Sequence, residues 1–519
     1  MEASHKYTAK VALTMYFCKI ANTAAEFDAI AALNYETFVE EIPQHESNTT
    51  RRLIDRFHHE NTYVVIYKEQ HLIGMLAFRD NRPFSVDGKV GVPVEQLLQD
   101  YDTSKLCEIR LLAIQKAFRN GRVFQKLAQA IYTYVYERGY SGAVISGVTR
   151  EEKLYRRIGF EAFAAVTGTA EAAFIPMILT RANCLRIQQQ IRLEPHNFYP
   201  GPVAQTELTH TTMSHRSVAF QELYAQMKQR LLTLTSMRDV TTLVGSGTLA
   251  NDVMLGQIRA TFGERRGLVL ANGEFGERLQ RQAAQWQLNF ETYDVPWGEA
   301  FDSGAVRQLI AQQHYAWLVF VHGETSTGVF NGALIDALAD VDVAICVDGI
   351  SSIGATPTNL VRCMMATAVS GKAIGALSGL AFVFTNEHFT ENAAPFYSNL
   401  AYYQQQALPF TLPAYLVANT VRALQQYPAR FELLQHRFNR LAQSSLAKYR
   451  FSAAPGYAMI ASFQLPEELC AIARLNSLLL HDESHYLKQR QLAQISVIGP
   501  QFDEAFVALQ KLVAWYEKL

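Results

Sequence analysis

Short apolar runs alternate with polar turns and amphipathic segments along the first third of the chain. Residues 63–67 and 72–78 flank a polar tetrapeptide, and this pattern predicts a β-hairpin. Residues 107–114 and 142–148 predict two further strands, and the apolar positions within 124–135 recur at helical spacing between them. A hairpin followed by a strand–helix–strand unit predicts an N-terminal α+β domain.

The region after residue 240 repeats a different pattern. Short and almost wholly apolar runs alternate with longer helical segments, which is typical of a doubly wound α/β sheet. The predicted strands are 241–244, 267–271, 316–321, 343–347 and 380–384. Because ligands of such sheets bind at the carboxyl ends of the strands, the turns that follow these runs form the candidate site.

A proline-rich break separates the two patterns. Pro195, Pro200 and Pro202 follow a polar helical segment, and a break of this kind is typical of a domain boundary. We therefore predict two domains, residues 1–194 and 195–519.

Composition narrows the function classes. A chain of 519 residues exceeds what one hydrophobic core usually serves, and 49% hydrophobic against 18% charged residues is an ordinary globular mixture. The formal net charge of −1 gives no electrostatic case for nucleic acid or an anionic membrane. The 6 cysteines are scattered without a CxxC pair, and neither a signal peptide nor a membrane-spanning run is recognised. We therefore expect a cytoplasmic protein with reduced thiols.

An acid and a lysine stand out in the second region. Asp348 ends the apolar run 343–347, and Lys372 follows in the tripeptide Ser370-Gly371-Lys372. A pyridoxal phosphate enzyme needs such a pair, because the lysine binds the cofactor covalently and the acid pairs with the pyridinium nitrogen. The alternative is an acid in a turn and an unrelated surface lysine.

Two other turns follow predicted strands. Residues 245–248 read Gly-Ser-Gly-Thr before a helical segment, and small residues and hydroxyls at a helix N-terminus suit a phosphate, although such a turn also serves as a plain helix cap. Phe275 lies between Gly273 and Gly276 after the next strand. An aromatic residue there either stacks on a planar ring or belongs to the core.

The order of these motifs resembles the class V aminotransferases of fold type I, and among them the 2-aminoethylphosphonate–pyruvate transaminases. The segments that carry the resemblance are YPGPV (199–203), SHR (214–216), GSGT (245–248), NGEFGER (272–278), PWGEAFD (296–302), HGETSTG (322–328), VDGISSIGA (347–355), SGK (370–372) and PFTLP (409–413). The resemblance implies a doubly wound large domain, a small C-terminal α/β domain and pyridoxal 5'-phosphate as cofactor.

By the same resemblance, Lys372 would be the Schiff-base lysine and Asp348 the partner of the ring nitrogen. The other implied cofactor-binding residues are Phe275 and Ile350 on the two ring faces, Ser246, Gly247 and Thr248 at the phosphate, Thr325 near the ring hydroxyl, Ser370 beside the lysine, and Thr411. Thr411 would reach the phosphate of a neighbouring subunit, so a homodimer with shared sites is implied.

The sequence departs from this family at two positions. Gly371 stands where the family usually has Asn or Gln before the lysine, and Gln494 aligns with the arginine that grips the substrate's carboxylate or phosphonate. The second departure argues against ordinary transfer between anionic amino acids and keto acids. The alternative reaction is decarboxylation, elimination or carbon–carbon bond formation.

The N-terminal domain has a motif of its own. The turn 118–122, with Arg119 and Gly121, connects a predicted strand to a helix, an arrangement that can hold a pyrophosphate on free backbone N–H groups. This order, with the segment YRRIGF that begins at Tyr155, resembles the GNAT N-acyltransferases. Residues 34–42 and 108–110 are nearer to the branch that makes N-acyl amino acids and acyl-homoserine lactones.

The resemblance implies a thioester of coenzyme A or of an acyl carrier protein as the donor, with Tyr155 protonating the leaving thiolate. The glycine spacing of the turn is shorter than usual in the family, so the alternative is a non-catalytic binding module. His481 and His485 have the i, i+4 spacing of a metal pair on a helix, but no third ligand is evident and we expect no metal. We therefore expect a bifunctional enzyme, a pyridoxal phosphate-dependent aminotransferase that acts on a small amine or carbonyl substrate, fused to an N-acyltransferase.

Overall fold

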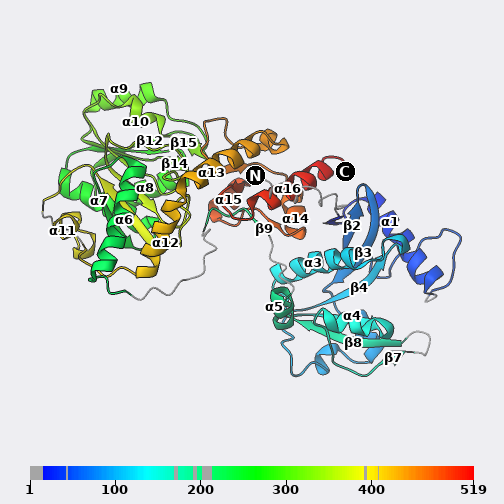
Figure 1. Ribbon diagram of the computed structural model, residues 1–519. Helices are drawn as coiled ribbons and strands as arrows, with labels where there is room; N and C mark the ends of the chain where they lie inside the picture. Colours follow the sequence, from blue (N-terminus) through cyan, green and yellow to red (C-terminus); the bar gives the residue numbers. More distant parts are fainter. Residues whose placement is uncertain are drawn as a thin grey trace, which may run out of the picture. The chain divides into compact units, whose positions relative to one another are not determined.

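The computed structural model describes residues 16–42, 45–168, 173–190, 196–201, 213–390, 394–406 and 408–519. The chain forms two compact units, each coloured along the sequence in Figure 1. Unit 1 comprises residues 1–196, 467–479 and 511–519, and unit 2 comprises 197–466 and 480–510. The predicted boundary at residues 194 and 195 lies outside the described residues.

Unit 1 is built on an eight-stranded sheet in the order β1-β2-β3-β4-β5-β8-β6, with β7 beside β8. The predicted hairpin is confirmed as β2 and β3, which pair antiparallel. The strands are β1 (Tyr16–Ile20), β2 (Thr62–Lys68), β3 (His71–Arg79), β4 (Leu106–Ile114), β5 (Gly142–Val148), β6 (Glu161–Ala162), β7 (Thr167–Gly168) and β8 (Ala173–Thr180).

The centre of this sheet opens between β4 and β5, which run parallel to each other. They pair only over residues 106–108 and 142–144, whereas β5 pairs with β8 along its whole length, from residue 142 to residue 148. β4 carries a bulge where the pairing ends, because two of its residues, Leu111 and Leu112, face the single residue Leu76 of β3. Leu111 has a φ of 51°, which is rare for a residue other than glycine. The two parallel strands therefore diverge beside a strained backbone.

Helices cover both faces of the unit 1 sheet. α3 lies along one face, as Figure 1 shows, and buries Val123, Leu127 and Ile131 against β1 to β4. α2 covers the other face through Phe84 and Val86. The helical segments are α1 (Ala24–Tyr35), the π-helical turn η1 (Glu36–Glu41), α2 (Ser85–Val90), η2 (Val94–Gln96), η3 (Lys116–Phe118), α3 (Gly121–Glu137), η4 (Thr149–Glu151), α4 (Glu152–Arg157) and α5 (Arg181–Gln190).

The C-terminal part of the chain completes unit 1. α14 (Glu467–Leu475) packs on α3 and β1, and Asn476 behind it takes the place of a neighbouring strand. Its Oδ1 accepts from the Cys18 N–H at 3.1 Å, and its Nδ2 donates to the Cys18 carbonyl at 2.8 Å. Trp515 stacks on Phe17 with the ring centroids 5.0 Å apart. These contacts cover β1, an edge strand, with residues from the far end of the chain.

Unit 2 contains a seven-stranded sheet in the order β10-β18-β17-β16-β13-β11-β12. β18 is antiparallel to both neighbours, and the other pairs are parallel. The strands are β10 (Asp239–Val244), β11 (Gly267–Ala271), β12 (Phe290–Asp294), β13 (Trp317–Val321), β16 (Ala344–Asp348), β17 (Cys363–Val369) and β18 (Leu380–Thr385). The five predicted strands are confirmed, and β12 and β17 were not predicted.

Helices enclose this sheet from both sides, so the predicted doubly wound architecture is confirmed. α6, α9, α10 and α12 pack on one face, and α7, α8 and α11 pack on the other. The helical segments are α6 (Val218–Thr235), α7 (Gly247–Phe262), α8 (Glu274–Gln285), α9 (Ser303–Gln313), α10 (Ala333–Ala337), η5 (Phe396–Ser398), α11 (Leu400–Gln405), α12 (Ala414–Gln425), α13 (Tyr427–Ala442), η6 (Ser445–Tyr449), α15 (His485–Arg490) and α16 (Phe502–Tyr516).

A smaller sheet follows in the C-terminal part of unit 2. β19 (Ile460–Phe463) pairs antiparallel with β21 (Ala493–Ser496). The remaining short strands of unit 2 are β14 (Gly323–Glu324) and β15 (Val329–Phe330), which pair with each other. β20 (Leu478–Leu479), which lies in unit 1, pairs with β9 (His196–Asn197). In the part of the chain that the structure describes, no helix combines the length and the apolar character needed to cross a bilayer.

Candidate functional site

Asp348 is the centre of the site in unit 2. It ends β16 in the middle of the sheet and is only 4% exposed. Asn251 of α7 donates from Nδ2 to Asp348 Oδ2 at 2.7 Å, and the backbone N–H of Ile350 donates to Oδ1 at 3.0 Å. Thr367 of β17 in turn donates from Oγ1 to Asn251 Oδ1 at 2.7 Å. This chain of hydrogen bonds fixes the carboxylate in one orientation.

The electrostatics of Asp348 and Lys372 are coupled. Burial raises the pKa of Asp348, and the hydrogen bonds from Ile350 and Asn251 and the charge of Lys372 offset only part of that effect. Burial likewise lowers the pKa of Lys372, although the charges of Asp348 and Glu324 oppose it. A buried acid that lacks a full counter-charge favours a cationic partner, and a lysine with a lowered pKa is a better nucleophile and base.

The turn between β10 and α7 forms an open cradle. Ser246 is the N-cap of α7, but its hydroxyl makes no capping hydrogen bond, and Ser246 and Thr248 are both exposed. Gly247 lies against Ile350, and a Cβ added to Gly247 would meet Ile350 Cδ1 at 2.5 Å. The structure therefore brings the predicted phosphate-binding residues and Ile350 together at a helix N-terminus. There the hydroxyls of Ser246 and Thr248 are exposed and could bind a phosphate.

Phe275 lies over the lysine. Lys372 Nζ is 5.6 Å from the centroid of the Phe275 ring, and the Arg278 guanidinium is 4.8 Å from the same centroid. The Glu324 carboxylate holds the first turn of α8 in place, since it accepts from the N–H groups of Gly276 and Phe275 at 3.0 and 3.4 Å. Glu324 was not singled out in the sequence, because an acid in a polar turn has no distinctive pattern.

Three predicted positions behave differently. Ser370 is fully buried, and its hydroxyl donates to the Leu377 carbonyl at 2.6 Å, so it ties the loop after β17 together. Gly371 has no room for a side chain, because an added Cβ would clash with Ser378 Oγ and lie 2.8 Å from the backbone Cα of Ser378. Thr411 lies exposed in the loop before α12, and no hydrogen bond connects it to the other predicted residues in the described part of the chain.

Gln494 lies beside Thr325, at the edge of β21. Its Nε2 donates to the carbonyls of Thr325 and Ser326 at 2.6 and 3.1 Å and to Ser462 Oγ at 2.8 Å. The side chain is fully buried, and its Oε1 has no hydrogen-bond partner among the described residues. A neutral, immobilised amide thus occupies the position that the alignment assigns to a substrate-binding arginine.

These residues fit pyridoxal 5'-phosphate. The cradle at Ser246, Gly247 and Thr248 offers donors and space for a phosphate, and Asp348 offers a buried carboxylate to a pyridinium nitrogen. Lys372 Nζ lies within reach of a ring placed under Phe275. Asn251 and Thr367 were missed in the sequence, because a polar residue inside an amphipathic helix or a buried strand has no local signature.

The histidine pair is not on one helix, so that interpretation is wrong. α15 begins at His485, and His481 precedes it in a β-bridge with Gln494. The i, i+4 spacing therefore does not place the two rings on one face. Within the described residues, no group of three or more His, Cys, Asp or Glu side chains converges in a way that suits a metal ion.

In unit 1, the backbone N–H groups at the start of α3 already have a hydrogen-bond partner within the chain. Asn120 is the N-cap of α3, and its Oδ1 accepts from the N–H groups of Arg122 and Val123, both at 3.1 Å. Arg119 donates to the Ile114 carbonyl at 2.8 Å and forms an ion pair with Glu41 at 2.6 Å. Gly121 begins the helix and has open space around it. A pyrophosphate would compete with the Asn120 side chain for these N–H groups.

Tyr155 lies beside the opening between β4 and β5. Its ring packs against Gly147 of β5, where an added Cβ would meet Tyr155 Cε2 at 2.6 Å. Burial raises the pKa of Tyr155, so its hydroxyl is protonated at neutral pH. Glycine at position 147 is therefore what allows this ring to reach the strand.

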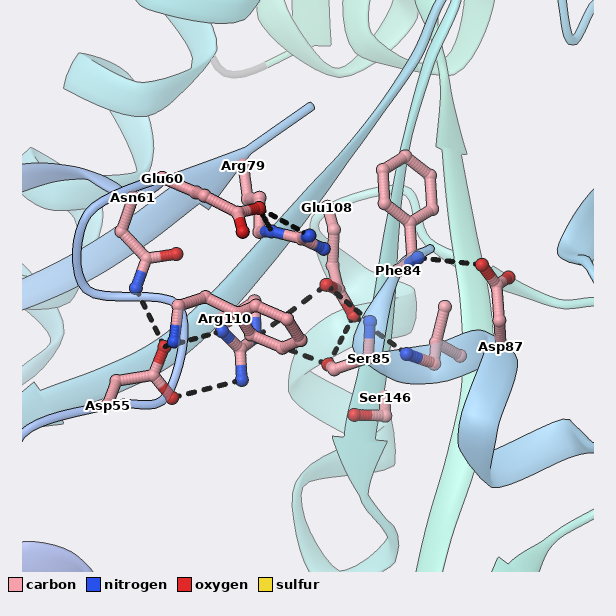
Figure 2. Close-up of polar contacts among 12 residues, drawn as sticks. Asp55, Glu60, Asn61, Arg79, Phe84, Ser85, Asp87, Glu108, Arg110 and Ser146 are labelled. Atoms are coloured by element: carbon pink, nitrogen blue, oxygen red, sulfur yellow. Dashed lines mark hydrogen bonds and ion pairs between the residues drawn. The ribbon is translucent and has the colours of Figure 1, made fainter. Parts of the chain in front are cut away.

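A polar network lies on the opposite face of the same opening (Figure 2). Arg110 of β4 forms a bidentate pair with Asp55, with distances of 2.8 and 3.2 Å, and Arg79 of β3 pairs with Glu60. Glu108 is 1% exposed and accepts from the Ser85 N–H, the Ser85 hydroxyl and the Val86 N–H. Burial alone would raise the pKa of Asp55, but its pairing with Arg110 leaves that pKa lowered. These pairs hold the loop before β2 over the ends of β3 and β4.

Comparison with known proteins gives a family match within unit 1 and matches to whole proteins. Residues 29–183 match the family model described as N-acyl amino acid synthase FeeM. A protein from Synechococcus sp. named "Soluble hydrogenase, small subunit" is 29% identical over 285 residues, which cover 50% of this chain and 73% of that protein. A 2-aminoethylphosphonate–pyruvate transaminase from Pseudomonas aeruginosa is 30% identical over 251 residues, which cover 44% of this chain and 67% of that protein.

Solved structures agree on the fold of the C-terminal region. The aspartate aminotransferase of subgroup IV from Thermus thermophilus matches 62% of this chain and 100% of its own, with a TM-score of 0.54 and 22% identity. The expected fold type I architecture is therefore confirmed.

Proposed function

Because this chain belongs to the family of the 2-aminoethylphosphonate–pyruvate transaminases and carries an N-acyl amino acid synthase domain, we propose that it is a bifunctional enzyme. Unit 2 is a pyridoxal phosphate-dependent aminotransferase, and unit 1 is an N-acyltransferase that uses an acyl thioester. The observation that carries this proposal is the buried Asp348, which Asn251 and Ile350 orient within the electrostatic range of Lys372.

The residues of unit 2 have separate roles in amino transfer. Bound pyridoxal phosphate supplies the electron sink for the carbanion that forms when the substrate loses a proton. Asp348 holds the proton on the ring nitrogen, since a buried carboxylate stabilises a neighbouring cation. Lys372 would hold the cofactor covalently, and its free Nζ could move the substrate proton, a role that its lowered pKa favours. Ser246 and Thr248 hold the phosphate through their free hydroxyls.

The substrate of unit 2 follows from the polar groups around Lys372. Gln494 cannot form an ion pair, and three acceptors already hold its amide nitrogen. Arg278 is a cation beside Phe275 whose charge acts on both Lys372 and Asp348, and it has a 3.5 Å ion pair with Glu274 on the same helix. We therefore propose that the substrate of unit 2 is a small amine that places no anionic group beside Gln494. If the substrate carries an anionic group, that group would bind Arg278.

The acyl thioester of unit 1 belongs in the opening between β4 and β5. Diverging parallel strands leave N–H and C=O groups without a partner strand, and the bulge at Leu111 turns backbone groups of β4 toward the gap. Tyr155 is placed to protonate the leaving thiolate. Because Asn120 occupies the N–H groups that a pyrophosphate needs, this geometry favours an acyl carrier protein over coenzyme A as the donor.

Unit 2 is proposed to work as a homodimer. An aromatic cluster of Phe396, Tyr397, Tyr402, Tyr403 and Phe410 lies before α12, and Phe396 is 63% exposed. Exposed aromatic residues in a group are typical of an interface, and Thr411 directly follows the cluster. A second copy of this chain would cover the cluster. Thr411 of the first copy would then contact the phosphate of the cofactor bound to the second copy.

A half-reaction on the purified full-length protein tests the function of unit 2. The protein would be mixed with amines that carry a carboxylate, a phosphonate or no anionic group, and the absorbance of the bound cofactor would be followed. Conversion to the pyridoxamine form by one of these classes supports amino transfer. Release of carbon dioxide, or no conversion by any amine, would refute it. Lys372→Ala should lose the visible absorbance of the attached cofactor, whereas Lys448→Ala, on the surface segment η6 of the same unit, should keep it.

A further inference from the structure

Lys89 is a positively charged residue of unit 1 that has no role in the acyl transfer proposed above. It lies near the end of α2, the helix whose Ser85 binds Glu108 of the polar network. Its Nζ donates to Ser146 Oγ of β5 at 2.7 Å and lies 3.7 Å from the centroid of the Phe174 ring. Arg110 and Arg79 have carboxylate partners, but no ion pair of Lys89 is found among the described residues.

The position of α2 brings Lys89 to the opening. Ser85 and Lys89 are one helical turn apart and therefore lie on the same side of α2. Ser85 binds Glu108 of β4, and Lys89 binds Ser146 of β5. α2 thus bridges the two strands at the point where their pairing ends, since residue 144 is the last of β5 to pair with β4.

Lys89 and Tyr155 lie on opposite faces of β5. Side chains alternate along a strand, and Tyr155 packs at Gly147 whereas Lys89 binds the neighbouring Ser146. A thioester in the opening would have its leaving sulfur toward Tyr155. An amine acceptor would then approach from the α2 face, where Lys89 stands.

The charges on the α2 face select the ligand. Glu108 is saturated by three hydrogen bonds, and Asp55 is paired with Arg110. Lys89 retains exposed surface, so a ligand can reach it. Desolvation by the surrounding protein lowers the pKa of Lys89 to about 8 although the residue is exposed, and a bound anion would raise that pKa again by neutralising the charge. An unpaired ammonium that is held over a phenyl ring is suited to an anionic group.

We propose that Lys89 binds the anionic group, a carboxylate or a phosphonate, of the amine that unit 1 acylates, and so selects charged acceptors. This inference rests on the acyltransferase function proposed for unit 1. The neutral amine nitrogen forms the C–N bond with the thioester carbon, the C–S bond breaks, the thiolate takes one proton, and the nitrogen loses one. Lys89 fixes the acceptor for this attack and exchanges no proton in it.

Acceptor competition on the full-length protein tests the proposal. Dodecanoyl transfer from coenzyme A or acyl carrier protein would be measured with phenylalanine, with 2-aminoethylphosphonate, and with phenethylamine, which lacks the anionic group. Loss of one hydrogen bond to a charged group corresponds to about a 10- to 100-fold change. Lys89→Met should therefore lower kcat/KM by about that factor for whichever charged acceptor is used, leave phenethylamine unchanged, and be rescued by Lys89→Arg.

A matched control and a binding measurement complete the design. Lys105 also donates to an oxygen, the Arg138 carbonyl, and lies over an aromatic ring, Tyr140. Lys105→Met should not change the preference among acceptors. In calorimetry, which needs no turnover, N-dodecanoyl-phenylalanine should bind Lys89→Met more weakly by the same factor. N-dodecanoyl-phenethylamine, which lacks the carboxylate, should bind the variant and the wild type equally.

Two outcomes separate the inference from its premise. Acyl transfer by the wild type with equal kcat/KM for charged and uncharged acceptors, or a preference that survives Lys89→Met, would overturn the role of Lys89 and leave the acyltransferase function standing. The absence of both transfer and product binding in the wild type would overturn the acyltransferase function and the inference together.

Discussion

The orientation of Asp348 provides a direct test of the site in unit 2. Asn251→Ala removes the 2.7 Å hydrogen bond to Asp348 Oδ2 and also the acceptor of the Thr367 hydroxyl. Only the Ile350 N–H then remains on the carboxylate. A hydrogen bond to a charged group contributes about 1.5–3 kcal/mol. Because the charged form of Asp348 loses this support, its pKa should rise and its hold on a cationic ring nitrogen should weaken.

Loss of the free energy that this hydrogen bond contributes corresponds to about a 10- to 100-fold rise in the dissociation constant of pyridoxal phosphate. The measurement is a titration of the apoprotein with the cofactor, followed by visible absorbance. Gln257→Ala is the matched control, since Gln257 is a buried amide on the same helix that donates to Thr261 Oγ1 at 3.0 Å. If Asn251→Ala binds the cofactor within about twofold of the wild type while Gln257→Ala does the same, the orienting role of Asn251 would be refuted.

Three further predictions concern stability. The lowered pKa of Asp55 means that its pairing with Arg110 stabilises the fold above the unfolded-state pKa of about 3.9 and is lost as the pH falls; Asp55→Asn should be less stable at pH 7 but show a flatter loss of stability below about pH 4 in acid titrations. Gly371→Ala should destabilise unit 2 by about 1–3 kcal/mol in thermal unfolding, because its Cβ would clash with Ser378, and an unchanged midpoint would contradict the packing argument. Asn476→Ala should leave two buried backbone groups of β1 without partners, at about 1–3 kcal/mol each, and hydrogen exchange should rise at β1 and not in the unit 2 sheet.

The sequence was most informative where a strand ends in a functional residue. Asp348 and the turn at Ser246 follow short apolar runs whose length and flanking residues predict strands, and both lie at the carboxyl edge as expected. β17 was missed because Cys363–Val369 is rich in Met and Ala, which favour helices, whereas the predicted strands contain more β-branched and aromatic residues. Periodicity alone cannot distinguish a short apolar run of that composition from a buried helix.

Partners across the fold could not be predicted in the same way. Asn251 reaches Asp348 only because α7 packs across the end of β16, and nothing local in the sequence specifies that distance. α14 has an amphipathic pattern that predicts a buried face, but not that this face covers α3 and β1. The periodicity of apolar residues predicts which side of a helix is buried, but it does not predict which other element packs on that side.

Unit 1 is assembled from segments that leave the ribosome at very different times. β1 to α5 emerge first, whereas residues 467–479 and 511–519 emerge last. The interval of about 270 residues between them takes roughly 14–54 s at about 5–20 residues per second. During that time β1 lacks both the hydrogen bonds from Asn476 and the stacking of Trp515 on Phe17. Unit 1 therefore keeps an uncovered strand edge, with which another chain could pair, until residues 467–519 have been made.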